Sequence, residues 1–234
     1  MLEAAAWGLV AGSSLVLGAA IGIWVPVSRR VVALIMGFGA GALVSALAFD
    51  LTAEAFEEGG ATVTAVGLAA GGLTFFIGDV LIESGAGKAA GAGLAIALGA
   101  LLDGLPESFV LGASLVGGAG ASVPFLVAVL LSNLPEGIAG ARDLREGAHS
   151  VRWILGLWCG VAVASGIAAA VGFAVVGSMA AEPQGLAKAF AAGAILTMLA
   201  DTLFPEAYEG GGKGVGLATL LGFTLAFFLS AVPD

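Results

Sequence analysis

The sequence predicts an all-α, polytopic membrane protein with about eight transmembrane helices. Hydrophobic residues make up 59% of the 234-residue chain and charged residues only 11%, whereas soluble domains carry about 25% charged residues. Long apolar stretches alternate with short polar or glycine-rich breaks, and each stretch approaches the roughly 20 residues that a helix needs to cross a bilayer. Together these observations exclude a soluble globular domain.

Eight apolar stretches fit the chain as one transmembrane domain over residues 1–234, because the breaks between them are too short for a second domain. The 39 glycines are expected where helices approach closely in lipid, since small residues allow backbone contact. The helices are expected at residues 4–27, 31–53, 62–82, 91–116, 122–141, 153–178, 186–208 and 214–232.

The basic residues gather on one side of the predicted bundle. Loops one, three, five and seven carry seven of the eight, and the opposite side carries only Lys188. The positive-inside rule therefore places the odd-numbered loops in the cytoplasm and both termini outside the plasma or inner membrane. The seven residues are Arg29, Arg30, Lys88, Arg142, Arg145, Arg152 and Lys213.

Two features exclude other classes of protein. The net charge of −9 does not favour binding to nucleic acid. Cys159 is the single cysteine and lies in a predicted span, so neither a disulfide framework nor a thiolate metal cluster is expected.

The chain contains two internal repeats. Residues 101–108 and 130–137 share the pattern Leu-Leu-x-x-Leu-Pro-Glu. One copy lies in span four and the other in span five, and consecutive spans run in opposite directions. The two copies therefore reach the same depth from opposite sides of the membrane.

A second repeat relates residues 51–57 to residues 203–209, and Val-Gly-Leu-Ala follows each copy at 66–69 and 215–218. These copies end spans two and seven, which also run antiparallel. The whole chain is thus predicted as three helices, a central pair and three helices again, with inverted symmetry. Inverted repeats whose broken helices meet at the midplane are typical of secondary transporters.

The first repeat places polar side chains near the membrane centre. Asp103 and Glu107 are four residues apart and share one helix face; Ser132 and Glu136 repeat this spacing on the next helix, beside Asn133. A carboxylate at this depth costs about 2.5–3.5 kcal/mol on insertion scales. Neither span contains a lysine or arginine, so a bound cation, bound protons or water in a cavity must compensate the three acids.

Each copy also contains a proline, Pro106 or Pro135. Proline has no amide hydrogen, so the carbonyls of Leu102 and Leu131 lose their helical donors. Freed carbonyls are tolerated where a neighbour, water or ion satisfies them, and here they are candidate neutral oxygen ligands.

Further acids are interpreted as a pathway to and from this centre, with a solvated helix end as the alternative for each. Asp50 and Glu54 lie at the outer end of span two, and Asp201 and Glu206 lie toward the inner end of span seven. Asp79, with Glu83, lies near the inner end of span three. By contrast, Glu57, Glu58, Glu209 and His149 are expected to be loop residues.

The paired Leu-Pro-Glu motifs resemble those of the ZIP (Zrt-, Irt-like) metal transporters. The family motif is His-Asn-x-Pro-Glu-Gly, and residues 133–137, Asn-Leu-Pro-Glu-Gly, match five of its positions. Pro106 and Glu107 match the other copy. The resemblance implies eight spans in a three-two-three arrangement with outward termini, and it implies that Glu107 and Glu136 bind the transported metal.

The chain also departs from the family pattern. Asp103 and Ser132 stand where histidines are usual, and Gly104 replaces an asparagine. Span six has no charged residue for a second metal position, and the histidine-rich cytoplasmic loop is absent. An oxygen-only ligand set suits harder ions, so we expect weaker zinc selectivity, with competition from manganese, iron(II) or cadmium.

The leading hypothesis is a transporter of divalent metal cations and not an enzyme, with the metal as substrate and no cofactor. In an alternating-access mechanism, its two three-helix halves would rock against the central pair. The resemblance to the family implies that the metal moves inward. A proton- or sodium-coupled carrier of another solute and a metal-binding membrane sensor without transport are the alternatives. An intramembrane enzyme is disfavoured, because no histidine lies in a predicted span. The expected surroundings are the lipid bilayer and no nucleic acid, and a homodimer is left open.

Overall fold

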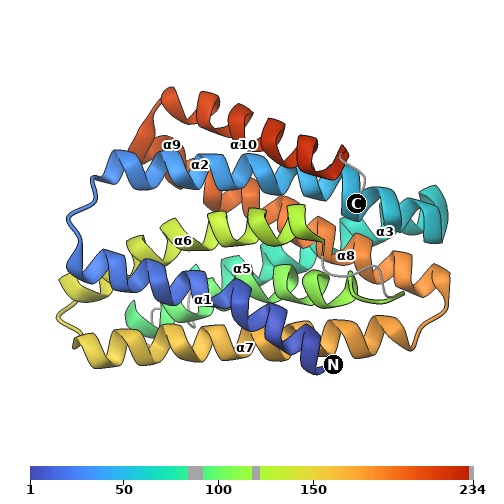
Figure 1. Ribbon diagram of the computed structural model, residues 1–234, viewed down its shortest axis with the longest axis horizontal. Coiled ribbons are helices and arrows are strands. Elements are labelled where there is room, and N and C mark those ends of the chain that lie inside the picture. Colours follow the sequence, from blue (N-terminus) through green and yellow to red (C-terminus); the bar gives the residue numbers. More distant parts are fainter. Residues whose placement is uncertain (84–91, 118–121, 232–234) are drawn as a thin grey trace.

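The computed structural model describes residues 1–83, 92–117 and 122–231, and every regular element in these ranges is a helix (Figure 1). This confirms the all-α prediction. The elements are α1 (Leu2–Trp24), α2 (Arg29–Ala46), the π-helix η1 (Leu47–Leu51), α3 (Thr52–Leu81), α5 (Ala92–Ala113), α6 (Val123–Glu146), α7 (Val151–Gly177), α8 (Ala181–Met198), the π-helix η3 (Leu199–Leu203), α9 (Phe204–Gly211) and α10 (Gly214–Ala231).

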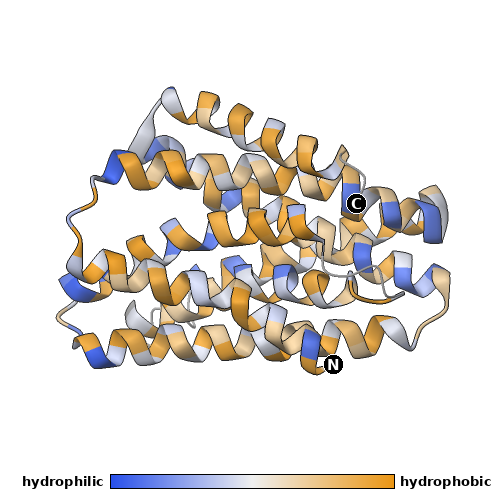
Figure 2. Ribbon diagram, in the orientation of Figure 1, coloured by the Kyte–Doolittle hydropathy of each residue, from blue (hydrophilic) through white to orange (hydrophobic). Residues whose placement is uncertain are grey.

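Among the described residues, seven helices are long and apolar enough to cross a membrane. Figure 2 shows hydrophobic residues along the length of these helices, with hydrophilic residues mostly toward their ends. By length and composition the chain is therefore a multi-pass membrane protein. The seven helices are Leu2–Trp24, Arg29–Leu81, Gly93–Ala113, Val123–Glu146, Val151–Gly177, Ala181–Gly211 and Gly214–Ala231.

The longest of these helices covers 53 residues and contains one non-helical residue, Gly60, with φ 71° and ψ 177°. The chain reverses direction at this end of the bundle, and α3 runs back alongside α8 (Figure 1). The predicted loop between residues 53 and 62 is therefore wrong, and Glu57 and Glu58 belong to α3. Glycine makes the short connection feasible, because it adopts a positive φ without the steric cost of a Cβ.

Two π-helices interrupt the bundle at related places. η1 contains Asp50 and leads into α3, and η3 contains Asp201 and leads into α9. A glycine with positive φ follows each π-helix at the same spacing: Gly60 after η1 and Gly212, with φ 59°, after η3. The second sequence repeat thus coincides with a matching local geometry. Glu209, expected in a loop, lies in α9.

Glycines join the helices into two closely packed groups, and the first group is α1, α5, α6 and α7. A Cβ on Gly12 of α1 would lie 2.7 Å from the Cα of Ala162 in α7. A Cβ on Gly137 of α6 would meet the Leu15 backbone of α1, and one on Gly112 of α5 would meet the Ala169 backbone of α7. Only glycine allows backbones this close.

The second group contains two separate glycine-joined pairs, α2 with α10 and α3 with α8. A Cβ on Gly41 of α2 would meet the Thr219 carbonyl of α10, and one on Gly193 of α8 would meet the Leu68 carbonyl of α3. Between the groups, one described glycine packs this closely on a backbone. Gly39 of α2 lies against residues 131 and 132 of α6. In the described residues no glycine joins α2 or α10 to α3 or α8, so α2 is joined more closely to α6 than to α3 or α8.

Candidate metal site

Helices α5 and α6 bring the two copies of the first repeat together. Ser132 on α6 lies within hydrogen-bonding reach of the Glu107 carboxyl group on α5. The Ser132 Oγ also lies 3.0 Å from the carbonyl of Val129, and its one hydrogen serves one of these acceptors at a time. The two motifs therefore face each other, as their antiparallel repeat predicts.

The predicted ligands are largely removed from solvent. Glu107 is 2% exposed and Asp103 8% exposed, Ser132 and Asn133 are also buried, and Glu136 is partly exposed. The Oε2 atom of Glu107 is buried with no hydrogen-bond partner. Burying a carboxylate without a partner is costly, so this part of the fold calls for a ligand or a proton.

Several acids lie close enough to interact electrostatically. Asp103 interacts with Glu107 and Glu136, and Glu206 from α9 interacts with both Asp103 and Glu136. Asp79 of α3 is a further neighbour of Asp103. Within the described ranges, the ion pairs all involve Lys188 at another place in the bundle. The acids around Asp103 are thus not neutralised by an ion pair there.

The arrangement does not form a compact ligand cage in this conformation. In residues 1–83, 92–117 and 122–231, no group of three or more histidine, cysteine, aspartate or glutamate side chains is close enough to hold a metal ion. The ligand assignments of Asp103, Glu107, Ser132, Asn133 and Glu136 therefore remain predictions.

Helix α2 packs against the backbone of α6 near Pro135. Leu131, whose carbonyl loses its helical donor to Pro135, packs against Gly39 of α2, where a Cβ would lie 2.8 Å from the Leu131 oxygen. This close contact leaves little room for an ion on that side of α6. Leu131 is accordingly a weaker candidate ligand than its sequence position suggests.

A cavity of about 400 Å³ opens at the end of the bundle where α2 begins and α6 ends. Ala139, which lines it, lies one helical turn beyond Glu136 on α6. Glu206 and Glu209 line it from α9. The other lining residues are Arg29, Val32, Ala33, Met36, Arg142, Asp143, Glu146 and Gly210.

The opposite side of the central acids is closed. The void there measures about 10 Å³, which is about the space of one water molecule. Asp50, Glu54 and Lys188 line it together with the apolar side chains of Val110 and Phe125. Asp50 accepts a hydrogen bond from Ser230 at 3.4 Å. The bundle is thus open at the arginine-bearing end and shut at the end of Asp50 and Glu54.

The remaining predicted pathway residues divide between two places. Glu206 lines the large cavity, whereas Asp201 is exposed and lies near Asp79, which also interacts with Glu83. Asp79 and Glu206 are both electrostatic neighbours of Asp103, and the joint exit of Asp201 and Glu206 stays a prediction.

Sequence reasoning missed two residues at the closed end, Lys188 and Glu58, which form an ion pair. Lys188 lies inside the predicted span 186–208, and a cation within a span needs an acidic partner. That expectation, applied with the four-residue spacing of Glu54 and Glu58, would have found the cluster. Arg29, Arg142, Asp143 and Glu146, which line the large cavity, were read only as loop charges or not at all.

The chain matches none of the protein-family models with which it was compared, and no curated protein matches it. The resemblance to ZIP transporters therefore rests on the motifs in spans four and five.

Proposed function

We propose that the protein transports divalent metal cations across a membrane by alternating access, through a site between α5 and α6. The observation that carries the proposal is the cluster of Asp103, Glu107 and Glu136, of which the first two are buried, with no lysine or arginine paired to it in the described chain. A cavity lies next to this cluster, since Ala139, one turn from Glu136, lines it. A divalent cation supplies the missing positive charge, and a cavity supplies a route for it.

The packing supports an inverted three-two-three repeat. Counting Gly60 as the end of one crossing gives eight spans, the number that returns the chain to the side on which it began. The contact of α3 with α8 then corresponds to that of α10 with α2, and α1 with α6 corresponds to α7 with α5. The close contacts of Gly41 and Gly193 follow the same relationship. Transporters with inverted repeats place their substrate sites at the repeat interface.

The conformation described here corresponds to the inward-open state of this cycle. The large cavity carries Arg29 and Arg142, which the positive-inside rule assigns to the cytoplasmic side. From that cavity an ion reaches Glu136 first and the buried Glu107 beyond it. The closed outer end prevents simultaneous access from both sides, as alternating access requires.

The glycine contacts favour different moving parts from those expected from the repeat alone. Instead of two three-helix halves rocking against a central pair, α1, α5, α6 and α7 would move as one body, and α3 and α8 would move together as a second body against it. Small residues lock helices within each group, and interdigitated interfaces resist sliding. The acids of α5 and α6 would then travel with the first body while Asp50 and Glu54 stay with the second.

Metal uptake into proteoliposomes across a panel of manganese, zinc, iron(II), cadmium and magnesium tests the proposal. Saturable uptake of at least one divalent ion supports it. Metal-dependent protection from heat unfolding without uptake would favour a membrane sensor, because a ligand stabilises the state it binds whether or not it is moved. Neither protection nor uptake by any of the ions would favour a carrier of another solute.

A further inference from the structure

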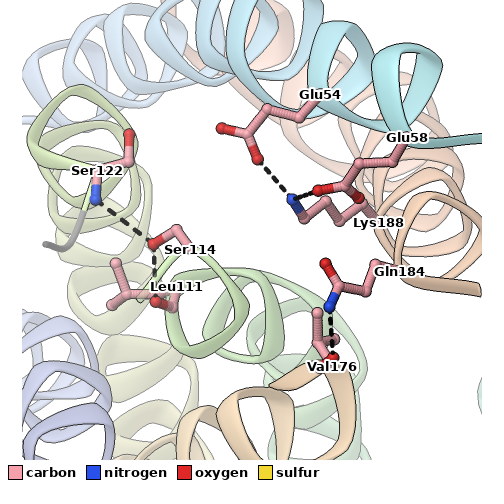
Figure 3. A network of polar contacts seen from close by, with 8 residues as sticks. All are labelled: Glu54, Glu58, Leu111, Ser114, Ser122, Val176, Gln184 and Lys188. Atoms are coloured by element: carbon pink, nitrogen blue, oxygen red, sulfur yellow. Dashed lines mark hydrogen bonds and ion pairs between the residues drawn. The ribbon is translucent and has the colours of Figure 1, made fainter. Parts of the chain in front are cut away.

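Lys188 is a buried cation at the closed end of the bundle, two turns inside α8. Its side chain is 9% exposed. Its Nζ lies 2.9 Å from Oε2 of Glu54 and 2.6 Å from Oε1 of Glu58, both on α3 (Figure 3). A lysine within a membrane span is costly and normally has a functional or paired role. Here one ammonium group bridges two carboxylates.

The ion pair is not needed to join the two helices that it links. Glycines already bring α3 and α8 into backbone contact at both ends of the pair: Gly185 packs on the Ala55 carbonyl, and Gly71 packs on the Phe190 carbonyl. A buried ion pair adds little net stability, because desolvation offsets the attraction between the charges. A purely structural role therefore does not account for placing a lysine here.

The position of Lys188 coincides with the outer end of the proposed pathway. It lines the water-sized void together with Asp50 and Glu54. Two carboxylates, those of Glu54 and Glu58, contact one ammonium, and Oε2 of Glu58 is buried without a hydrogen-bond partner. Asp50 adds a third carboxylate to the lining of the void. The cluster thus retains negative charge and an unused acceptor beside the cation that it already holds.

We infer that Lys188 is a tethered cation that competes with the transported metal ion for the outer carboxylates Glu54 and Glu58. The inference rests on the proposed function, since it takes a divalent cation as the competitor. The ammonium group already occupies Oε2 of Glu54 and Oε1 of Glu58, so an ion that binds these oxygens must displace it. The lysine stem is flexible and carries a compact charge, which allows the ammonium to leave the carboxylates without movement of α8.

The unaltered protein tests this through the reactivity of its own lysines. The chain has three lysines, and Lys213, which is exposed, provides an internal reference. Acylation by a water-soluble succinimidyl ester, read by mass spectrometry on the full chain in nanodiscs, should be slower at Lys188 than at Lys213. Added manganese(II) should raise the Lys188 rate at least several-fold and leave the Lys213 rate unchanged. An unchanged or lower Lys188 rate would overturn the inference.

A pair of variants provides the second measurement, in a Glu136→Gln background that disables the central site. Lys188→Met removes the competing charge at similar length and should tighten manganese binding at least about tenfold. Lys188→Arg keeps the charge and should leave binding close to that of the background. Equal binding by the two variants would overturn the inference. Metal-dependent exposure of Lys188 without any uptake into proteoliposomes would overturn transport alone, because the competition itself would stand.

Discussion

Glu107 on α5 and Ser132 on α6 lie within hydrogen-bonding reach, although they come from two separate copies of one sequence motif. Both residues are buried. The two proline-containing helices thus lie side by side here, and Asp103 and Glu136 are close enough to interact electrostatically. This arrangement is the starting point for the predictions on metal binding.

Replacing either central glutamate should abolish metal binding at the central site. Glu107→Gln and Glu136→Gln keep the shape of the side chain and remove its charge, so the ion loses a strong oxygen ligand. We expect at least about a 100-fold loss of affinity, the upper range for losing even an outer-shell partner of a metal site. Isothermal titration of the purified variants with manganese and zinc measures this loss.

Glu57→Gln is the matched control, because Glu57 is exposed on α3 and takes no part in the ion pairs of its neighbours. It should bind metal with the affinity of the unaltered protein. Normal metal binding by Glu136→Gln would show that the ion does not sit between α5 and α6.

The choice of metal should shift when imidazole is introduced. Asp103→His, alone or with Ser132→His, replaces oxygen donors by the nitrogen donors that zinc prefers. We expect zinc affinity to rise relative to manganese affinity. Binding isotherms for both metals before and after each change give the ratio. A ratio that stays the same or falls would remove Asp103 and Ser132 from the set of ligands.

Much of this arrangement follows from local pattern alone. Apolar length gives the helices, and the repeated Leu-Pro-Glu motifs bring Glu107 near Ser132 because antiparallel repeats meet at one depth. The predicted end of span two, at residue 53, was wrong. The hydropathy falls at Glu54, Glu57 and Glu58, but the helix continues to Gly60. Acids that pair with a buried lysine on another helix do not end a helix, and the sequence does not reveal that pairing.

Other features depend on side-chain direction, which spacing alone does not provide. Asp201 and Glu206 are close in sequence, yet η3 and α9 turn them to different surroundings, so only Glu206 lines the cavity. The freed carbonyl of Leu131 was a plausible ligand until the packing of Gly39 against it was known. Contacts between distant helices decide such cases.

Small residues in the helix contacts should be far less tolerant than those facing lipid. Gly41→Ala adds a Cβ that would collide with the Thr219 carbonyl, and overpacking of this kind costs about 1–3 kcal/mol. Gly160→Ala is the control, because no atom lies within 4 Å of its Cβ position; it should be neutral or stabilising by up to about 1 kcal/mol. Thermal unfolding in detergent compares the two, and equal melting temperatures would contradict the packing.

The orientation in the membrane should follow the basic residues. Glu182→Cys and Arg152→Cys, each in a Cys159→Ala background, place single thiols on exposed residues near opposite ends of α7. An impermeant maleimide added to intact cells should label position 182 only. Labelling at position 152 instead would invert the orientation and turn the large cavity toward the outside.

The most direct test of the central claim is manganese uptake into proteoliposomes that contain equal amounts of unaltered protein or of Glu136→Gln. The account predicts saturable uptake by the unaltered protein, inhibition by competing divalent ions, and uptake by the variant no higher than in protein-free vesicles. Equal uptake by both proteins would contradict a route through the acids of α5 and α6.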